Sequence, residues 1–241
     1  MPYQSIFREG TFAGQTIIVT GGGSGIGRCT AHELAALGAH VVLVGRTLEK
    51  LEAVKAEIAE DGGSASAQAC DIRDEAAVGQ TIDAVLQAQG RVDGLVNNAG
   101  GQYRTAMKTI STKGFEAVVR NNLTETAACE WAASGVRVNT VAPGGIASSG
   151  FDTYAPEAKA KILEYPKTVP LQRFGTEAEV SSAIVYLLSP AAAFITGSCI
   201  RVDGGTPNAR GTWTLAESDR SQPFEGFHRA KMPELLRKRP G

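Results

Sequence analysis

The sequence predicts a doubly wound α/β domain, in which a parallel sheet is covered by helices on both faces. Short apolar segments rich in β-branched residues alternate with helical segments of about ten to fifteen residues. Glycines follow several of the helical segments, where they end a helix at little steric cost. The strands are apolar throughout, which is typical of a parallel sheet buried on both sides.

The predicted elements follow one another in a regular order. Strands are expected at 16–20, 41–44, 67–72, 95–97, 136–141 and 199–202. Helices are expected to begin at Gly25, Thr47, Asp74, Ser111 and Thr176. The segment 206–241 is polar and interrupted by prolines, so we interpret residues 1–205 as one domain and 206–241 as a C-terminal tail.

The composition excludes several functional classes. The 241 residues carry 24 basic and 25 acidic side chains, and a net charge of −1 lacks the basic excess of a nucleic-acid-binding protein. No apolar run reaches the length of a membrane span and the N-terminus lacks a signal-peptide pattern, so a cytoplasmic protein is expected. The four cysteines form no C-x-x-C pair, which predicts buried reduced thiols and no metal site.

A glycine-rich turn joins the first strand to the first helix. Its residues are Thr20-Gly21-Gly22-Gly23-Ser24-Gly25-Ile26-Gly27. Glycines allow a tight turn and the close approach of a pyrophosphate to the helix N-terminus, whose free N–H groups and positive dipole end favour an anion. Because the turn lies between a strand and a helix, a dinucleotide site is favoured over a purely structural turn.

The second strand ends at Gly45-Arg46-Thr47. NAD-binding proteins usually place an acidic residue here, which accepts hydrogen bonds from the ribose hydroxyls. Arg46 instead offers a guanidinium group that suits a 2′-phosphate. The sequence therefore favours NADP(H) over NAD(H), with a surface arginine beside a helix cap as the alternative.

A series of motifs lies between residues 10 and 205. Besides the turn at 20–27, they are Cys70-Asp71-Ile72, Asn97-Asn98-Ala99-Gly100, Asn121-Asn122-Leu123-Thr124, Arg137-Val138-Asn139, Pro143-Gly144, Ile195-Thr196-Gly197 and Val202-Asp203-Gly204-Gly205. In this order they resemble the short-chain dehydrogenase/reductase family, which has a Rossmann fold. Within it, residues 98–102 and 188–197 are similar to the peroxisomal trans-2-enoyl-CoA reductase and dienoyl-CoA reductase members.

The resemblance implies a set of site residues and a tetrameric assembly. For the pyrophosphate and the adenosine it implies Gly21, Ser24, Gly25, Ile26, Gly27, Asp71, Ile72, Asn98 and Gly100. For the nicotinamide carboxamide it implies Pro143, Gly144 and Ile146, with Ser148 near the phosphates. Asn122 matches the asparagine that holds a water in the proton relay of the family, and is the one catalytic residue that the resemblance assigns.

The Tyr-x-x-x-Lys pair of the family is absent. A lysine four residues after a tyrosine lies on the same helix face and can lower the tyrosine pKa. Tyr103 and Lys108 are five residues apart, as are Tyr154 and Lys159, and on a helix this is a rotation of roughly 140°. We therefore interpret both pairs as ordinary surface or pocket-rim residues.

The missing pair points to the Thr124–Glu125 bond, where two helix fragments that are distant in the family adjoin. Either the sequence omits roughly fifty to sixty residues here, one helix–strand–helix unit, or the protein lacks them. A protein without them needs an empty slot in its sheet or must move its later strand beside 95–97. We favour omission, because a continuous packed core is the stable arrangement.

Two functions are compatible with these observations. The first is an NADP(H)-dependent oxidoreductase that transfers hydride between nicotinamide and a carbonyl, an alcohol or an enoyl thioester. The alternative is a catalytically silent dinucleotide-binding protein that senses or scaffolds. The expected substrate loop, 148–167, mixes aromatic residues with Lys159, Lys161 and Lys167, which fits an acyl-CoA phosphate or a solvated helix face equally well.

Overall fold

The computed structural model describes residues 5–100, 123–154, 156–206, 218 and 220–237. Its main sheet consists of parallel strands in the order β3-β2-β1-β4. These strands are β1 (Thr16–Thr20), β2 (His40–Gly45), β3 (Ser64–Ala69) and β4 (Gly94–Val96). The order and the parallel pairing confirm the predicted α/β class.

Helices cover both faces of the main sheet. On one face lie α1 (Gly25–Ala36), α2 (Leu48–Glu60) and α7 (Glu177–Leu188), and on the other lies α3 (Glu75–Gln89). Because side chains alternate along a strand, Ile17 and Val19 of β1 enter the core under α1 and α2, whereas Ile18 enters the core under α3. The helix expected from Ser111 lies outside the described residues.

The two remaining strands, β5 (Thr140–Pro143) and β6 (Cys199–Val202), form a separate parallel sheet. Neither pairs with β4 in the part of the chain that the structure describes, so the single expected sheet is divided in two. Helix α5 (Leu123–Trp131) continues through the Thr124–Glu125 bond. Two arrangements are expected for a chain without the extra unit, and the structure has the one in which the later strands stay apart from β4. In this arrangement Leu95 of β4 is 49% exposed.

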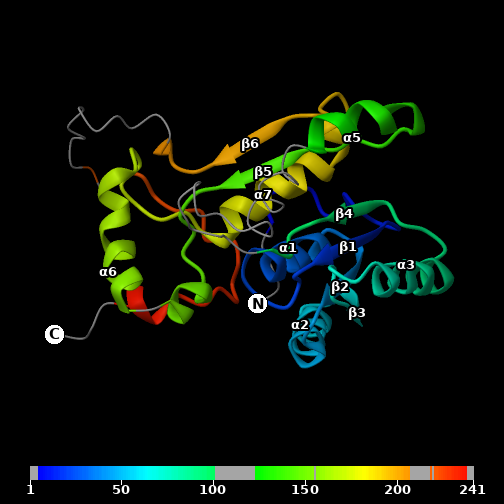
Figure 1. Cartoon of the computed structure of the whole chain (residues 1–241), viewed down its shortest axis with the longest axis horizontal. Coiled ribbons are helices and arrows are strands. Elements are labelled where there is room, and N and C mark those ends of the chain that lie inside the picture. The colour runs from blue at the N-terminus through cyan, green and yellow to red at the C-terminus, as the bar shows by residue number, and fades with distance from the viewer. Residues whose placement is uncertain (1–4, 101–122, 155, 207–217, 219, 238–241) are drawn as a thin grey trace.

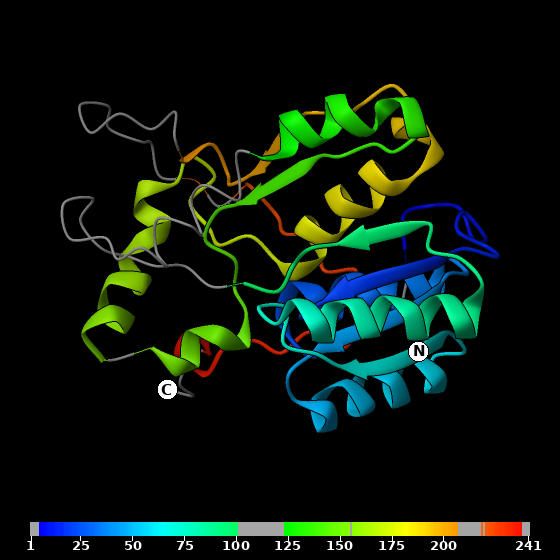
Figure 2. The ribbon, with the colours of Figure 1, turned by 45° about the vertical axis from the view of Figure 1, so that its right-hand side comes forward.

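The strands of both sheets point to the same side of the molecule. In Figure 2 their arrowheads face the side on which α6 (Pro156–Glu164) lies, the helix labelled at the left of Figure 1. Ligands of open parallel sheets bind outside the carboxyl ends of the strands. This side is therefore where a site is expected.

Four strands differ from their predicted bounds, and two of them, β3 and β5, differ by more than one residue for local reasons. The strand predicted at 67–72 is β3, which ends earlier because the Asp71 carbonyl accepts from the backbone N–H of Asp74 and begins a turn. The strand predicted at 136–141 is β5, which begins later. There the backbone N–H of Val138 donates to the Thr196 hydroxyl rather than to a neighbouring strand.

The described part of the C-terminal tail packs on the domain. The Phe227 side chain is 3% exposed and packs with Cys29 of α1 and Ala178 of α7. The Thr176 hydroxyl donates to the Phe224 carbonyl over 2.7 Å. Although the segment 206–241 is polar in composition, the buried Phe227 side chain attaches it to the domain.

The four cysteines differ in their burial. None of the four cysteines forms a disulfide, and only Cys29 and Cys70 are buried. The prediction of buried thiols is wrong for Cys129 and Cys199, because α5 and β6 lie outside the main cores that bury the other two.

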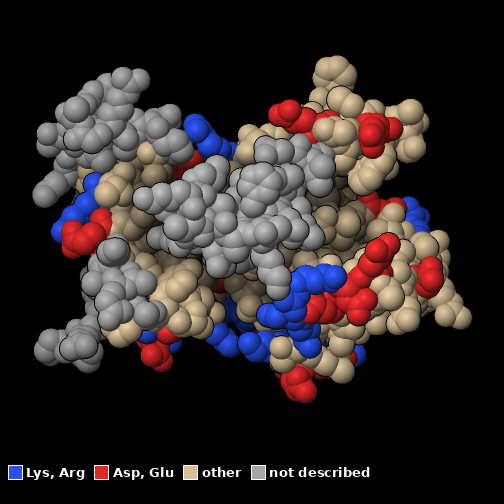
Figure 3. Space-filling model, in the orientation of Figure 1, with Lys and Arg blue, Asp and Glu red and all other residues tan. Residues whose placement is uncertain are grey.

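Among the described residues, no helix is long and apolar enough to cross a membrane. Basic and acidic side chains lie among one another on the face shown in Figure 3.

Candidate functional site

Thr20 joins the carboxyl ends of β1 and β4. Its hydroxyl accepts from the backbone N–H groups of Asn98 and Ala99, at 3.0 and 2.9 Å. The side-chain amide of Asn98 donates to the Thr20 carbonyl over 3.0 Å. These bonds hold Asn98, a predicted site residue, against the start of the glycine-rich turn.

The glycine-rich turn packs too closely to admit side chains. A Cβ atom on Gly27 would lie 2.5 Å from the Gly21 carbonyl oxygen and 2.5 Å from Nδ2 of Asn98. Gly21 has a φ of 69°, which favours glycine. Ser24 is the N-cap residue of α1, and its side chain makes no capping hydrogen bond. The first turn of α1, which begins at Gly25, therefore presents helix N–H groups with no capping side chain.

Charged residues follow the ends of β2 and β3. The two strands pair up to Gly45, so Arg46 and Asp71 come after neighbouring strand ends. The Asp71 carboxylate accepts from Nε of Arg73 over 2.8 Å. That guanidinium group, with a smaller contribution from the charge of Arg46, holds the pKa of Asp71 well below its usual range. Asp71 is thus an ionised acceptor that an adenine amino group would share with Arg73, and Arg46 is exposed beside it.

A second group of predicted residues follows β5. The backbone N–H of Gly144 donates to a β6 carbonyl over 2.9 Å, which extends the small sheet beyond β5. Ile146 is 7% exposed and pairs with Gly175. The hydroxyl of Tyr165 accepts from the backbone N–H of Gly145 over 2.9 Å and covers the turn.

The structure thus places the predicted cofactor residues in two groups at the carboxyl edges of two sheets. The first group, on the main sheet, is Gly21, Ser24, Gly25, Ile26, Gly27, Arg46, Asp71, Ile72, Asn98 and Gly100. The second group, after β5, is Pro143, Gly144, Ile146 and Ser148. The start of α7 lies between the two groups. Just before α7, Gly175 pairs with Ile146 of the second group. The first residue of α7, Glu177, lies beside Gly25 of the first group.

The candidate catalytic positions lie outside the described residues or on different elements. Asn122 lies outside the described residues, as do Tyr103 and Lys108. Tyr154 follows a 3-10 turn at 149–153, whereas Lys159 belongs to α6, so the two do not share a helix face. The described residues therefore include the predicted cofactor-binding positions and no proton relay of the kind that the family uses.

Sequence reasoning missed Glu177. An acidic residue at the first position of a helix is an ordinary helix-start signal and predicts exposure. In the structure this side chain is 6% exposed, because α7 lies against α1. The burial of Glu177 becomes apparent only from the packing of α7 on α1, two helices that are distant in sequence.

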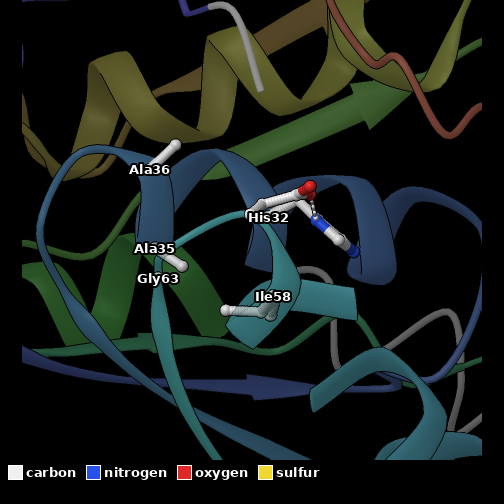
Figure 4. Close-up of a pocket in the computed structure, with 6 residues that line it drawn as sticks. His32, Ala35, Ala36, Ile58 and Gly63 are labelled. Atoms are coloured by element: carbon white, nitrogen blue, oxygen red, sulfur yellow. Dashed lines mark ion pairs between the residues drawn. The ribbon is translucent and has the colours of Figure 1, made fainter. Parts of the chain in front are cut away.

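A small hollow between α1 and α2 is too small to be a ligand site. It is lined by His32, Ala35, Ala36, Ile58, Asp61 and Gly63 (Figure 4). A volume of about 10 Å³ holds at most one water molecule. Burial lowers the pKa of His32, which lies 3.3 Å from the Asp61 carboxylate. No group of three potential metal ligands occurs in the described ranges.

Parallel strands, a glycine turn at a helix N-terminus and polar residues at strand ends together define a dinucleotide-binding α/β protein. Comparison with family models identifies the family within this class of proteins. Residues 15–126 match the short chain dehydrogenase model, and residues 119–207 match the model described as Enoyl-(Acyl carrier protein) reductase. The chain belongs to the short-chain dehydrogenase/reductase family, as its motifs predict.

Individual relatives are similar over most of the chain. The probable 2,4-dienoyl-CoA reductase of Bacillus subtilis is 29% identical over 79% of this chain and 96% of its own. The 2,5-dichloro-2,5-cyclohexadiene-1,4-diol dehydrogenase of Sphingobium indicum is 32% identical over 80% and 97%. Among solved structures, a citronellol catabolism dehydrogenase of Pseudomonas aeruginosa has a TM-score of 0.73 and 46% identity, over 85% of this chain and 99% of that one.

The curated relatives have positions without a counterpart in this chain. The match to the Bacillus subtilis protein runs over 243 positions, whereas 79% of the 241 residues of this chain is about 190, so about fifty positions have no counterpart. The two family models meet at residues 119–126, across the Thr124–Glu125 bond. The junction predicted from the sequence coincides with the place where the two matches meet.

Members of the family bind a nicotinamide dinucleotide, and the first group fits one. A Cβ atom on Gly21 or Gly27 would lie 2.8 or 2.5 Å from Nδ2 of Asn98, so the turn keeps the tight shape that a pyrophosphate-binding turn requires. The uncapped N–H groups of α1 supply the donors that a pyrophosphate requires. The second group offers backbone donors and acceptors after β5, but it lies on the β5-β6 sheet, which is separate from the main sheet that carries the first group.

Proposed function

We propose that this protein is an NADP(H)-dependent short-chain oxidoreductase that transfers hydride between the nicotinamide and a carbonyl, alcohol or enoyl-thioester substrate. The single observation that carries the proposal is Arg46, exposed at the end of β2 next to the glycine turn of a dinucleotide-binding family. A guanidinium group there suits a 2′-phosphate, and no acidic residue takes its place.

In this proposal each residue group has a distinct role. The cofactor supplies the hydride. The N-terminus of α1 holds the pyrophosphate, Asp71 accepts from the adenine amino group, and Arg46 pairs with the 2′-phosphate. The turn after Pro143, with Ile146, orients the carboxamide, so that one face of the nicotinamide meets the substrate.

The substrate class follows from relatives and from the loop 148–167. A 2,4-dienoyl-CoA reductase among the relatives supports an acyl-CoA thioester, and Lys159 and Lys167 offer charges for its phosphates. With an enoyl thioester, hydride adds to the β-carbon and the acid need only protonate the α-carbon or polarise the thioester, whereas ketone reduction requires a proton on the developing alkoxide oxygen. We also propose a cytoplasmic homotetramer with no nucleic-acid or membrane partner, in line with the family and with the balanced charge.

A silent dinucleotide-binding protein is the second candidate, because one observation favours it. The sequence contains no Tyr-x-x-x-Lys, and the two sheets that carry the adenosine and nicotinamide groups are separate. Such a protein would bind NADPH and report its presence through a partner.

Two measurements separate these functions. NADPH and NADH are titrated into the protein by fluorescence, and NADPH oxidation is then followed with 2,4-dienoyl-CoA, trans-2-enoyl-CoA and a panel of ketones. The oxidoreductase predicts tighter binding of NADPH and turnover of at least one substrate. Tight NADPH binding without turnover over the whole panel would identify the silent binder, and stronger NADH binding would refute the role of Arg46.

A further inference from the structure

Glu177, the first residue of α7, is a buried carboxyl group that the proposed function does not use. Its side chain is 6% exposed. Within the described ranges it accepts no hydrogen bond. A buried carboxyl without a donor is costly when ionised, so its position calls for a reason.

The position of Glu177 is set by the packing of α7 on α1. The two helices begin side by side and run together, since the hydroxyl of Ser181, one turn after Glu177, donates to the carboxylate of Glu33 on α1. Oε1 of Glu177 lies 3.8 Å from where a Cβ atom of Gly25 would be. Gly25 is the first residue of α1, so this carboxyl lies beside the helix N-terminus that receives the pyrophosphate.

The basic residue of α1 that faces Glu177 is already engaged. Nε of Arg28 donates to the Glu57 carboxylate of α2 over 2.7 Å. Its NH1 group donates to the Arg229 carbonyl over 3.0 Å, and its guanidinium carbon lies 4.9 Å from the centre of the Phe227 ring. Arg28 therefore provides charge at a distance and no hydrogen bond.

The other charged groups packed around this region also have partners. On α7 itself, Glu179 accepts from Arg173 over 2.6 Å. On the tail, the side chains of His228 and Arg229 are turned to Asp61, at 3.1 and 3.0 Å. The described surroundings thus offer Glu177 no cation that would hold it ionised.

Burial consequently raises the pKa of Glu177 to about 7. The charge of Arg28 acts in the opposite direction, as does the positive end of the α7 dipole. At neutral pH this carboxyl exchanges between its charged and neutral forms, next to a site built for an anion.

We propose that Glu177 is a proton-carrying residue of the dinucleotide site, which is neutral whenever a pyrophosphate occupies the N-terminus of α1. The proposal rests on the proposed function, since it takes the pyrophosphate to bind at that turn. A carboxylate that is itself buried and a pyrophosphate held beside it repel each other, because water screens the buried charge poorly. Binding to the ionised form therefore takes up one proton from solvent, which neutralises the Glu177 carboxylate, and no other bond changes.

ADP-ribose is the probe that tests this coupling. It carries the pyrophosphate diester, lacks both the nicotinamide and the 2′-phosphate, and has no ionisation near neutral pH. Binding is measured by calorimetry between pH 6 and 9, in pairs of buffers with different ionisation heats, which gives both the Kd and the number of protons taken up. The wild-type Kd is expected to rise by up to about tenfold per pH unit above pH 7, with proton uptake.

Three variants complete the experiment. Glu177→Gln mimics the neutral form and is expected to bind with the low-pH affinity at every pH, without proton uptake. Glu177→Leu is a second neutral variant, and circular dichroism checks that both fold. Glu75→Gln is the matched control, because Glu75 is also the first residue of its helix but is exposed, and it should keep the wild-type pH dependence.

The outcomes separate this proposal from the proposed function. If ADP-ribose binds without proton uptake, or if Glu177→Gln keeps the pH dependence, the role of Glu177 is wrong whatever the enzyme does. If binding shows the coupling but no substrate oxidises NADPH, hydride transfer is wrong and the role of Glu177 stands. A wild-type protein that binds ADP-ribose at no pH refutes the role of Glu177, whereas the proposed function is refuted only if NADPH does not bind either.

Discussion

The hydroxyl oxygen of Thr20 lies 3.0 Å from the backbone nitrogen of Asn98, while the Thr20 carbonyl accepts from Nδ2 of the same asparagine at the same distance. β4 spans only Gly94–Val96, so these bonds take over where its ladder to β1 ends. The beginning of the glycine turn and the residue after β4 are therefore fixed to each other without a ligand, and Asn98 closes one side of the turn.

Replacing Thr20 by valine should separate the two strand ends. Thr20→Val keeps the volume but leaves the N–H groups of Asn98 and Ala99 without their acceptor, which costs about 1–3 kcal/mol of unfolding free energy. Urea unfolding measures the loss, and NADPH affinity should fall with it. Thr30→Val is the matched control. The Thr30 hydroxyl is buried and has no hydrogen-bond partner among the described residues, so that variant should be as stable as the wild type or more stable. Equal losses in both would contradict the argument.

Arg46→Ala should weaken NADPH binding without affecting NADH. A charged hydrogen bond to a phosphate is worth about 1.5–3 kcal/mol, so the Kd for NADPH should rise about 10- to 100-fold. Arg91→Ala removes another exposed arginine, which lies before the amino end of β4 and pairs with Asp93, and should leave both affinities unchanged. A parallel loss for NADPH and NADH after Arg46→Ala would show that this residue does not select the cofactor.

Phe227→Ala should release the tail from α1 and α7. The ring is 3% exposed and packs against Cys29 and the Arg28 guanidinium group, so we expect a loss of about 3 kcal/mol in unfolding free energy. Phe194→Ala serves as the comparison, since the Phe194 side chain is fully exposed and its removal should change stability little. Limited proteolysis would show whether the tail becomes accessible. An unchanged stability for Phe227→Ala would mean that the tail does not contribute to the fold.

Much of the main sheet could be predicted because its signals are local. β1 has the bounds expected from its apolar run, and Asp74 caps α3 by accepting from two backbone N–H groups. The glycine turn was recognisable for the same reason, since the residues that form it are consecutive. Such features depend on neighbours in the sequence, and the sequence displays those neighbours directly.

The remaining features depend on contacts between distant segments. Glu177 has an ordinary helix-start sequence, and its burial results from α1, about 150 residues earlier in the chain. Phe227 lies in a polar segment whose composition conceals a single apolar anchor. The separation of β5 from β4 was foreseen only as one of two alternatives, because sequence spacing shows that a unit is missing but not how the strands respond.

Acid should destabilise the protein through His32. Burial, the largest effect, lowers the pKa of His32 below its unfolded value of 6.5, so the unfolded state binds the proton first. Stability from the neutral imidazole is therefore present above pH 6.5 and is lost as the pH falls below it. His32→Gln should show a smaller loss of unfolding free energy between pH 7 and 5 than the wild type. His40→Gln, at a less buried site, should change this slope less. Identical slopes in the wild type and His32→Gln would refute the assignment.

The intact mass of the protein decides how the Thr124–Glu125 bond arises. The 241 residues have a mass of 25.2 kDa, and roughly fifty to sixty further residues at the same mean residue mass add about 5–6 kDa. We expect the heavier mass for protein made from the intact gene, because the divided sheet leaves Leu95 at 49% exposure beside an otherwise buried strand. A mass of 25.2 kDa would refute omission. The shorter protein should then bind an apolar dye at its exposed strand edge, since no described strand pairs with the outer side of β4.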